Sequence, residues 1–434
     1  MQPNRPHDAA AGALPDLPAS RTSGRGATKS DSLSGRRGSR SLLRDLNMSL
    51  LIELVRQRGP ISRAELARQS QISPATITAV VAHLLGRGIV SEVALAPSRG
   101  GRPPILLQLN PEAGFAVGVK LRGDGLTTVV CDLDARIVAT DELGETLAGD
   151  PTAAVAAVEQ ATRRVLRQAR VARSKVLGVG IGLPGIIDPH RGVCRFSHLL
   201  DWSDVSLGEP LSKRLRLPVW VDNDVKTLAI AEKWTGDGIA AHNFVTLSVG
   251  RGVGLGIVID RSLYRGAAGG AGELGHIIVE VDGPLCECGR AGCLEALVGE
   301  QALRRRIGER LGRSISHDEL VLLAGSGDLV THDVLEEAGR ELGIAVANAM
   351  TLLNPELLII GGEGTELGPA FLDPIVSAVH ELSFANLGRE IEVKIQKWGD
   401  EAWAVGAATL VLRETFNIPD ADEERQAIWH RLGV

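Results

Sequence analysis

The feature of this sequence that most constrains its fold is a histidine followed by three cysteines. His276, Cys286, Cys288 and Cys293 are spaced H-x9-C-x-C-x4-C. Three thiolates and one imidazole complete the tetrahedral shell of a zinc ion and leave no position open for water or a substrate. Gly289 lies where the chain must turn tightly around an ion. The spacing therefore predicts one structural zinc ion per chain.

Chance placement and a disulfide are the alternatives for these cysteines. The whole chain contains five cysteines, and it does not open with the basic, apolar and small-residue segments of a secretory leader. Both features argue against a disulfide framework. We also find no apolar run in the sequence that is long enough to span a bilayer. We therefore expect a cytoplasmic protein with reduced cysteines and no membrane partner.

The residues around the predicted zinc site form a longer pattern, GELGHIIVEVDGPLCECGRAGCLE at 272–295. This pattern resembles the signature of the ROK family, which groups sugar-responsive repressors with bacterial sugar kinases. The resemblance covers about residues 111–414 and places the histidine and the cysteines on the family's zinc ligands. It implies an α/β body with two lobes, of the actin and hexokinase (ribonuclease-H-like) type. It also implies assembly into homodimers or homotetramers.

The composition limits how the chain can meet nucleic acid. The chain has 434 residues, 44% of them hydrophobic, which suits a soluble protein of two or three domains. A net charge of −6 argues against a surface that binds nucleic acid everywhere, but it permits a small basic module. Residues 1–40 are rich in Pro, Ala, Gly, Ser and Arg, and we predict a disordered basic tail there. Its arginines leave open a DNA-contacting arm or a merely solvated tail.

From residue 41 to about 110 the pattern becomes that of short amphipathic helices. Leucines at helical spacing predict a first helix that ends at Gly59-Pro60. Ser62 is predicted to cap a second helix and Ser73 a third. Two helices joined by a tight turn, the second of them polar on one face, are typical of a helix-turn-helix. The candidate DNA contacts at the start of the third helix and on its outward face are Ser73, Thr76, Thr78 and His83.

A basic hairpin tip is predicted behind this third helix. Two short alternating stretches, at 89–90 and 106–109, enclose the segment SRGGRPP at 98–104. Arginine on an extended, proline-stiffened backbone fits a narrow minor groove, so Arg99 and Arg102 are predicted to contact DNA. The alternative is a three-helix interaction module that never touches DNA. The basic tip favours a winged helix-turn-helix that binds double-stranded operator DNA.

The remainder of the chain is predicted to form two lobes, at 111–240 and 241–434, with the last helix returning to the first lobe. Strands are expected at 115–121, 126–133, 136–140 and 176–181 in the first lobe, with a long helix at 151–170, and at 244–249, 254–259, 262–264, 356–360 and 391–395 in the second. The similar order in the two halves indicates a two-lobed α/β protein with a cleft between the lobes.

Several polar residues are candidates for binding a sugar in that cleft. The loop at 182–185 resembles the family's sugar-binding loop, and Asn223-Asp224 resembles its catalytic pair. Amides, carboxylates and imidazoles suit vicinal hydroxyls, because each hydroxyl both donates and accepts a hydrogen bond. The resemblance assigns sugar binding to Gly185, Asn223, Asp224, Glu273, His276 and Glu295. The aspartate at position 224 matches the proton acceptor of the kinases, although an aspartate after a strand can also cap a helix.

The loops that bind phosphate in the family's kinases are altered in this chain. Where the family has D-x-G-G-T, the chain reads KLRGDG at 120–125, so that Lys120 replaces an aspartate. A second loop, usually G-T-G, carries Arg251 in its middle. Both cations could attract a phosphate, but phosphoryl transfer depends on placing a metal, and both loops that do so have changed. We therefore predict no catalytic residue and no kinase activity, with Asp224 acting in sugar binding.

Together these patterns favour a transcriptional repressor whose winged helix binds an operator and whose body binds a sugar or sugar derivative. Binding of the sugar is expected to release the repressor from the operator. Two alternatives remain open. One is an ATP-dependent sugar kinase that carries a DNA-binding module, and the other is a regulator whose body binds a protein partner instead of a sugar.

Overall fold

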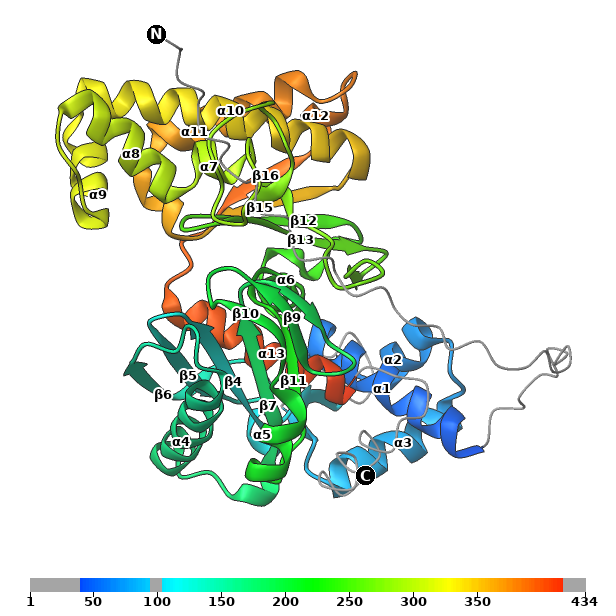
Figure 1. Ribbon diagram of the computed structural model, residues 1–434. Coiled ribbons are helices and arrows are strands. Elements are labelled where there is room, and N and C mark those ends of the chain that lie inside the picture. The colour runs from blue at the N-terminus through cyan, green and yellow to red at the C-terminus, as the bar shows by residue number, and fades with distance from the viewer. Residues whose placement is uncertain (1–39, 94–103, 417–434) are drawn as a thin grey trace, which may run out of the picture.

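The computed structural model describes residues 40–93 and 104–416 of the chain. Two lobes are stacked on one another, and a small helical module lies beside the lower lobe (Figure 1). Within the described ranges, no helix combines the length and the apolar character needed to cross a membrane.

The small module is a winged helix. Its elements are α1 (Arg40–Arg58), β1 (Ile61–Ser62), α2 (Arg63–Ser70), α3 (Pro74–Gly86), β2 (Val90–Val93) and β3 (Leu106–Leu109). The strands form an antiparallel sheet in the order β1-β3-β2, and β1 was not anticipated from the sequence. The predicted tail up to residue 39 and the predicted wing arginines, Arg99 and Arg102, lie outside the described residues.

The predicted helix caps of the winged helix are confirmed. Ser62 Oγ accepts a hydrogen bond from the backbone N–H of Glu65 at 3.2 Å and caps α2. Ser73 Oγ accepts one from the N–H of Thr76 at 3.2 Å and caps α3. A capping serine satisfies one of the unpaired N–H groups at the start of a helix. The apolar face of α3 is buried as expected, at Ile77, Val80, Val81 and Leu84.

The first lobe contains a five-stranded sheet in the order β11-β7-β4-β5-β6. Its elements are β4 (Phe115–Arg122), β5 (Gly125–Cys131), β6 (Ile137–Gly144), α4 (Pro151–Ala169), β7 (Val176–Leu183) and β11 (Val219–Asn223). A smaller sheet of β8 (Ile186–Asp188), β9 (Val193–Ser197) and β10 (Trp202–Ser206), followed by α5 (Gly208–Leu215), connects β7 to β11. The sequence analysis did not single out β11 or the smaller sheet.

The second lobe repeats the arrangement of the first. Its sheet has the order β14-β13-β12-β15-β16, with two antiparallel pairs followed by two parallel pairs, as in the first sheet. The strands are β12 (Phe244–Val249), β13 (Val253–Ile259), β14 (Ser262–Tyr264), β15 (Leu357–Gly361) and β16 (Glu392–Ile395). The helices α7 (Glu295–Val298), α8 (Glu300–Leu311), α9 (His317–Ser326), α10 (Leu329–Leu353), α11 (Pro369–Leu382) and α12 (Leu387–Glu390) lie on the side away from the first lobe (Figure 1). The repeated order confirms the predicted fold class.

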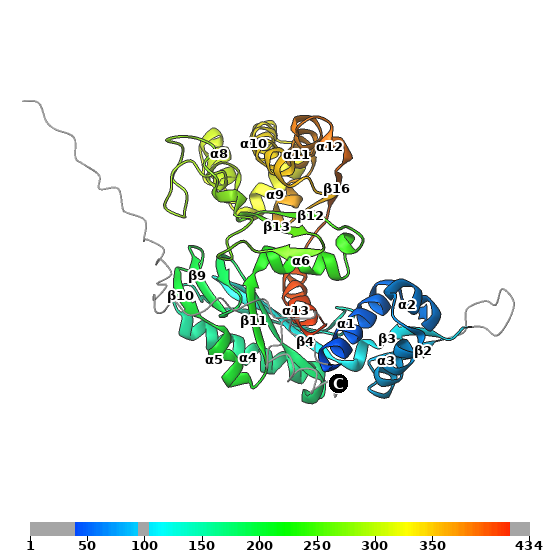
Figure 2. The same cartoon turned by 90° about the vertical axis from the view of Figure 1, so that its right-hand side faces the viewer.

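Two helices lie between the sheets and tie the lobes together. α6 (Asp224–Trp234) follows the first sheet and packs on β13 of the second, whereas α13 (Asp400–Phe416) follows the second sheet and packs on β4 and β7 of the first (Figure 2). Glycines allow α13 to approach the sheet closely. A Cβ atom at Gly118 would lie 1.9 Å from the carbonyl oxygen of Ala404, and one at Gly180 would lie 1.9 Å from that of Ala407.

The winged helix is attached to the body where α6 ends. The Arg56 guanidinium of α1 lies 4.1 Å from the centre of the Trp234 ring, and its Nη1 donates to the Trp234 carbonyl oxygen. The Trp234 ring stacks in turn on Phe416, at the end of α13, with 6.3 Å between ring centres. Buried side chains of α1, including Leu51 and Val55, share one apolar cluster with both rings. The module is therefore in contact with the two helices that join the lobes.

Candidate functional site

A cavity of about 1270 Å³ lies between the two lobes. It is bordered by the ends of β7 and β11 in the first lobe and by β13 and the loop before α7 in the second. All six residues that the resemblance assigned to sugar binding line it: Gly185, Asn223, Asp224, Glu273, His276 and Glu295. The fold therefore brings together residues that are up to 110 positions apart in the sequence.

On the first-lobe side, Asn223 connects the sheet to α6. Its Oδ1 accepts a hydrogen bond from the N–H of Lys226 at 3.2 Å, which caps the helix, and its Nδ2 donates to the carbonyl oxygen of Gly185 at 3.1 Å. Gly185 has a φ of 119°, and a Cβ atom there would lie 2.3 Å from the carbonyl oxygen of Phe196. Only glycine suits that position. The helix cap is thus Asn223, and the alternative that Asp224 is the cap is wrong.

Asp224 forms a buried ion pair that the sequence did not reveal. Its Oδ2 accepts a hydrogen bond from Lys120 Nζ, and both side chains are about nine-tenths buried. The same ammonium group lies 4.4 Å from the centre of the Trp403 ring of α13. A lysine held between a carboxylate and an aromatic face is well placed to compensate the buried negative charge.

Two buried glutamates face the cavity from the second lobe. Burial raises the pKa of Glu295, and its Oε2 accepts a hydrogen bond from the N–H of Val253 at 3.0 Å. Burial also raises the pKa of Glu273, while the nearby positive charge of Lys226 acts in the opposite direction. Lys226 is itself almost completely buried and donates to the carbonyl oxygen of Gly269 at 2.6 Å. Both carboxyl groups can accept or donate a hydrogen bond to a hydroxyl group.

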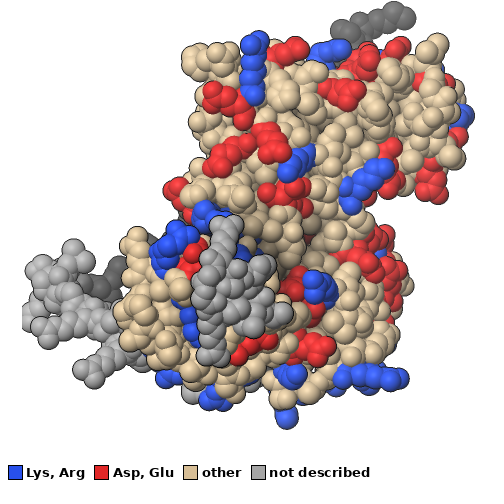
Figure 3. All heavy atoms as spheres, turned by 180° about the vertical axis from the view of Figure 1, so that it is seen from behind, with Lys and Arg blue, Asp and Glu red and all other residues tan. Residues whose placement is uncertain are grey.

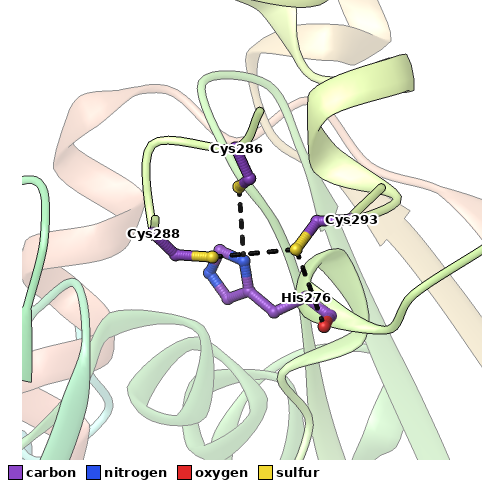
Figure 4. A group of neighbouring side chains, drawn as sticks. All are labelled: His276, Cys286, Cys288 and Cys293. Carbon is purple, nitrogen blue, oxygen red and sulfur yellow. Dashed lines mark hydrogen bonds between the residues drawn. The ribbon is translucent and has the colours of Figure 1, made fainter. Parts of the chain in front are cut away.

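The predicted metal ligands converge in one group beside the cavity (Figure 4). His276 Nδ1 lies 3.8 Å from Cys286 Sγ, and the Sγ atoms of Cys288 and Cys293 are 3.7 Å apart. Zinc–sulfur bonds of about 2.3 Å in a tetrahedron separate neighbouring sulfurs by about 3.8 Å. A disulfide would need about 2.05 Å between sulfurs, and all three thiols are free. The donor set and its spacing therefore fit a closed zinc site.

The thiols of this group also need a cation in order to ionise fully. Burial raises the pKa of Cys286 to about 12, so the thiol is protonated at neutral pH without a metal. Burial acts in the same direction on Cys288, but hydrogen bonds to Arg290, Cys286 and Cys293 together outweigh it and lower the pKa of that thiol. A bound zinc ion displaces such protons and is held by the resulting thiolates.

The candidate DNA contacts on α3 differ in how free their polar atoms are. Ser73 Oγ and Thr76 Oγ1 lie 2.9 Å apart and share a hydrogen bond. Thr78 is exposed, but its hydroxyl donates to a carbonyl oxygen one turn earlier at 2.8 Å. His83 is half-buried, with its Nε2 3.1 Å from Nη2 of Arg44 in α1. Thr76 and His83 are seven residues apart and hence lie on the same face of the helix.

His198 is among the cavity residues that were not singled out from the sequence. His198 lies in the turn between β9 and β10, and its ring meets that of His276 edge to face, with 5.4 Å between ring centres. A single histidine in a turn has no motif around it, so nothing in the sequence pattern distinguished it. Its position depends on how the small sheet folds over the cavity.

The fold and the cavity together define a class of protein, a winged helix joined to a two-lobed, hexokinase-like body. The model of the ROK family matches residues 116–414. The chain therefore belongs to the ROK family. The model of the MarR family matches residues 48–93, which lie within the winged helix.

Relatives that are similar over most of their length are regulators by name. The xylose repressor of Caldicellulosiruptor bescii is 28% identical over 396 residues, which cover 88% of this chain and 99% of the relative. The DNA-binding transcriptional dual regulator NagC of Escherichia coli is 30% identical over 395 residues, which cover 88% and 95%.

Among solved structures, a regulator matches a larger share of this chain than a kinase does. A ROK family transcriptional regulator, described as a homolog of the E. coli MLC protein, superposes with a TM-score of 0.77 at 27% identity and covers 90% of this chain and 99% of its own. A ROK family glucokinase from Streptomyces griseus, in complex with glucose and AMPPNP, gives 0.61 at 30% identity and covers 68% and 99%. The glucokinase thus leaves about a third of this chain without a counterpart.

Proposed function

We propose that this protein is a sugar-responsive, DNA-binding transcriptional repressor that leaves its operator when a sugar or sugar derivative binds between the lobes. The observation that carries this proposal is the path of α6. The helix begins at Asn223 and Asp224 in the cavity and ends at Trp234, against Arg56 of the winged helix. The relatives named as repressors, which align over most of both chains, support the same function.

Operator DNA is proposed to bind the winged helix rather than the body. On the face of the body shown in Figure 3, basic and acidic side chains are interspersed over both lobes. Such a surface does not concentrate the positive potential that a phosphate backbone requires. The proposed contacts are Ser73, Thr76, Thr78 and His83 near α3, together with Arg99 and Arg102 of the sequence-predicted wing.

The cavity is proposed to bind the sugar, and the His/Cys group is proposed to bind one zinc ion. A closed zinc site supplies no catalysis but fixes the backbone between its ligands. The segment from His276 to Cys293 lies between Glu273 and Glu295 in the sequence. The metal would therefore hold both glutamates in place beside the cavity.

We further propose that the cavity does not transfer phosphate. A general base must have a carboxylate free to take the proton of the attacking hydroxyl. Asp224 is instead paired with Lys120. This lysine stands where the first phosphate loop of the kinases carries an aspartate. Arg251 stands in the second altered loop, and its guanidinium pairs with Glu287 at 3.1 Å. The first loop thus has a lysine in place of the acid that would place a metal ion on phosphate, and Asp124 further along that loop pairs with Arg122 at 3.3 Å.

Domain boundaries near residues 40, 110 and 240 are part of the same proposal, as is assembly into dimers or tetramers. One winged helix offers little contact for specific binding, whereas a dimer can read two half-sites about one helical turn apart. Size-exclusion chromatography with light scattering measures the assembly directly.

The test of the proposed function combines DNA binding with a sugar panel. Genomic fragments enriched by the purified protein would serve as operator DNA, and their affinity would be measured with and without D-xylose, D-glucose and N-acetyl-D-glucosamine. We expect one sugar class to weaken operator binding and to raise the melting temperature of the protein, because it binds the native state. ATP turnover with the same sugars would establish a kinase. Release of DNA by a protein, with no response to any sugar, would establish a partner-controlled regulator.

A further inference from the structure

His198 reaches across the cavity from one lobe to the other. It lies in the β9–β10 turn, which belongs to the first lobe, near the edge that faces the second lobe (Figures 1 and 2). Its Nε2 is 3.8 Å from Oε1 of Glu295, and its ring contacts that of His276. Both of those residues belong to the second lobe and line the same cavity. The side chain is therefore part of the wall that a ligand between the lobes would touch.

The turn that carries His198 is held by hydrogen bonds on both sides. Ser197 Oγ accepts one from the N–H of Leu200 at 3.3 Å, and the carbonyl oxygen of Leu200 accepts one from the N–H of Gly149 at 2.8 Å. The neighbouring side chains Leu200 and Trp202 are buried. The position of the imidazole therefore does not depend on a ligand.

Two polar atoms in this part of the wall lack a partner. His198 Nε2 is buried and makes no hydrogen bond within the part of the chain that the structure describes. Its distance of 3.8 Å to Glu295 exceeds the usual limit of about 3.2 Å. Glu295 Oε2 accepts from the N–H of Val253, which leaves Oε1 directed to the imidazole. A buried polar atom left unpaired is costly, so a group that bonds to His198 Nε2 and to the adjacent Glu295 Oε1 would bind strongly.

A hydroxyl group has the chemistry that this pair of atoms requires. Its oxygen can accept a hydrogen bond from an imidazole N–H and donate its own hydrogen to a carboxylate. An oxygen about 2.8 Å from each atom can bridge a gap of this length from one side. A methylene group at the same place would leave both atoms unpaired in a buried wall.

We propose that His198 is a specificity-determining residue, which together with Glu295 binds one hydroxyl group of the sugar ligand. The proposal rests on the proposed function, since it names a contact within the same cavity. It predicts that the ligand is a sugar with a free hydroxyl group at one particular carbon. The matching deoxy sugar is rejected, because the pair of polar atoms would stay unpaired in its complex.

The test combines changes in the sugar with substitutions of His198 and measures the affinity of each combination by isothermal titration calorimetry. The probes are D-glucose, D-xylose and N-acetyl-D-glucosamine, followed by the monodeoxy analogues of the one that binds best. We expect the wild type to bind one of these analogues roughly tenfold more weakly than the parent sugar. His198→Phe, which keeps an aromatic ring without a donor, should bind the parent and that analogue equally.

A matched control and a conservative variant separate recognition from folding. His190, an exposed histidine in the β8–β9 turn, serves as the control, and His190→Phe should retain the wild-type preference. His198→Gln retains a donor and should restore part of the preference, and it replaces the phenylalanine variant if that variant fails to fold. Equal loss of affinity for all analogues in His198→Phe, or an unchanged preference, overturns the proposal and leaves the proposed function standing. If none of the probe sugars binds the wild type, both the proposed role of His198 and the proposed function fail.

Discussion

At the scale of single residues, the ion pair of Lys120 with Asp224 is the observation on which the proposed lack of phosphate transfer rests. The two side chains come from β4 and the start of α6, and each is about 10% exposed. Removing one member of a buried pair leaves an uncompensated charge, which costs far more than the pair contributes. The pair therefore links the proposed loss of a catalytic base to the stability of the protein.

We predict that Lys120→Met lowers the free energy of unfolding by about 3–5 kcal/mol, because Asp224 stays buried without its cation. The double variant with Asp224→Asn should recover a large part of that loss. The control is Lys213→Met, which removes an exposed pair with Glu209 and should leave stability almost unchanged, because water screens exposed pairs. Urea unfolding monitored by circular dichroism measures all three. A loss for Lys120→Met no larger than that of the control would contradict the argument.

The His/Cys group leads to a second prediction at this scale. Purified protein should contain close to one zinc per chain, and Cys288→Ser should retain almost none, because three donors hold the ion too weakly. Cys194→Ser, which changes a buried thiol outside the group, should keep the metal. Mass spectrometry of the metal content decides the point. Folded wild-type protein without metal would show that the assignment is wrong.

At the scale of elements, α6 connects the cavity to the DNA-binding module. Asn223 and Asp224 start the helix at the sugar site, and Trp234 ends it against α1 and α13. A movement of the lobes that shifts the start of a rigid helix also shifts its end. We propose that closure of the cavity is passed to the winged helix through the contact of Arg56 with Trp234.

We predict that Arg56→Ala reduces the coupling between sugar and DNA while leaving each affinity alone nearly unchanged. Coupling energies of this kind are typically about 1–3 kcal/mol, so a response of 5- to 150-fold should fall toward onefold. Arg58→Ala, an exposed arginine two residues further along α1, is the matched control. Fluorescence anisotropy with labelled operator, with and without the sugar, gives the ratio. If Arg56→Ala responds as strongly as the control, the signal takes another route.

At the scale of the whole molecule, the sugar acts by preferring one arrangement of the lobes. The proposed contacts, Gly185 and Asn223 on one side and Glu273 and Glu295 on the other, line the cavity from both lobes, so we expect tighter binding when the lobes are closed. Any ligand with such a preference shifts the equilibrium between the arrangements. The winged helix, attached at the ends of α6 and α13, follows that equilibrium.

Thermodynamic linkage makes this prediction testable from either side. Operator DNA must weaken sugar binding by the same factor by which sugar weakens operator binding. Glu273→Gln should leave operator affinity intact and weaken the response to sugar at least about tenfold, because a buried contact with the ligand is changed. Calorimetry with and without operator measures how much DNA weakens sugar binding. DNA titrations with and without sugar measure how much sugar weakens operator binding, and the two factors should agree. A Glu273→Gln protein that still releases DNA at the wild-type sugar concentration would place the sensor elsewhere.

The sequence alone determined the features that depend on residues close together in the chain. The spacing of His276 and the cysteines predicted a group that the structure brings together, and Ser62 and Ser73 announced the helices that they cap. Apart from β11, the strands of the two five-stranded sheets were found, because their residue patterns are local. The candidate sugar-binding residues were assigned from the resemblance to a family pattern, which reflects the fold that the family shares.

Only the tertiary structure decided which distant residues meet. Lys120 and Asp224 are 104 positions apart, and nothing near either residue predicts the ion pair. His198 acquires its place from a sheet of three short strands, whose pairing depends on contacts outside their own segments. The exchange of α6 and α13 between the lobes likewise follows from burial in three dimensions. Local patterns fix elements because their interactions span a few residues, whereas the contacts that shape the cavity join distant residues and exist only after the chain has folded.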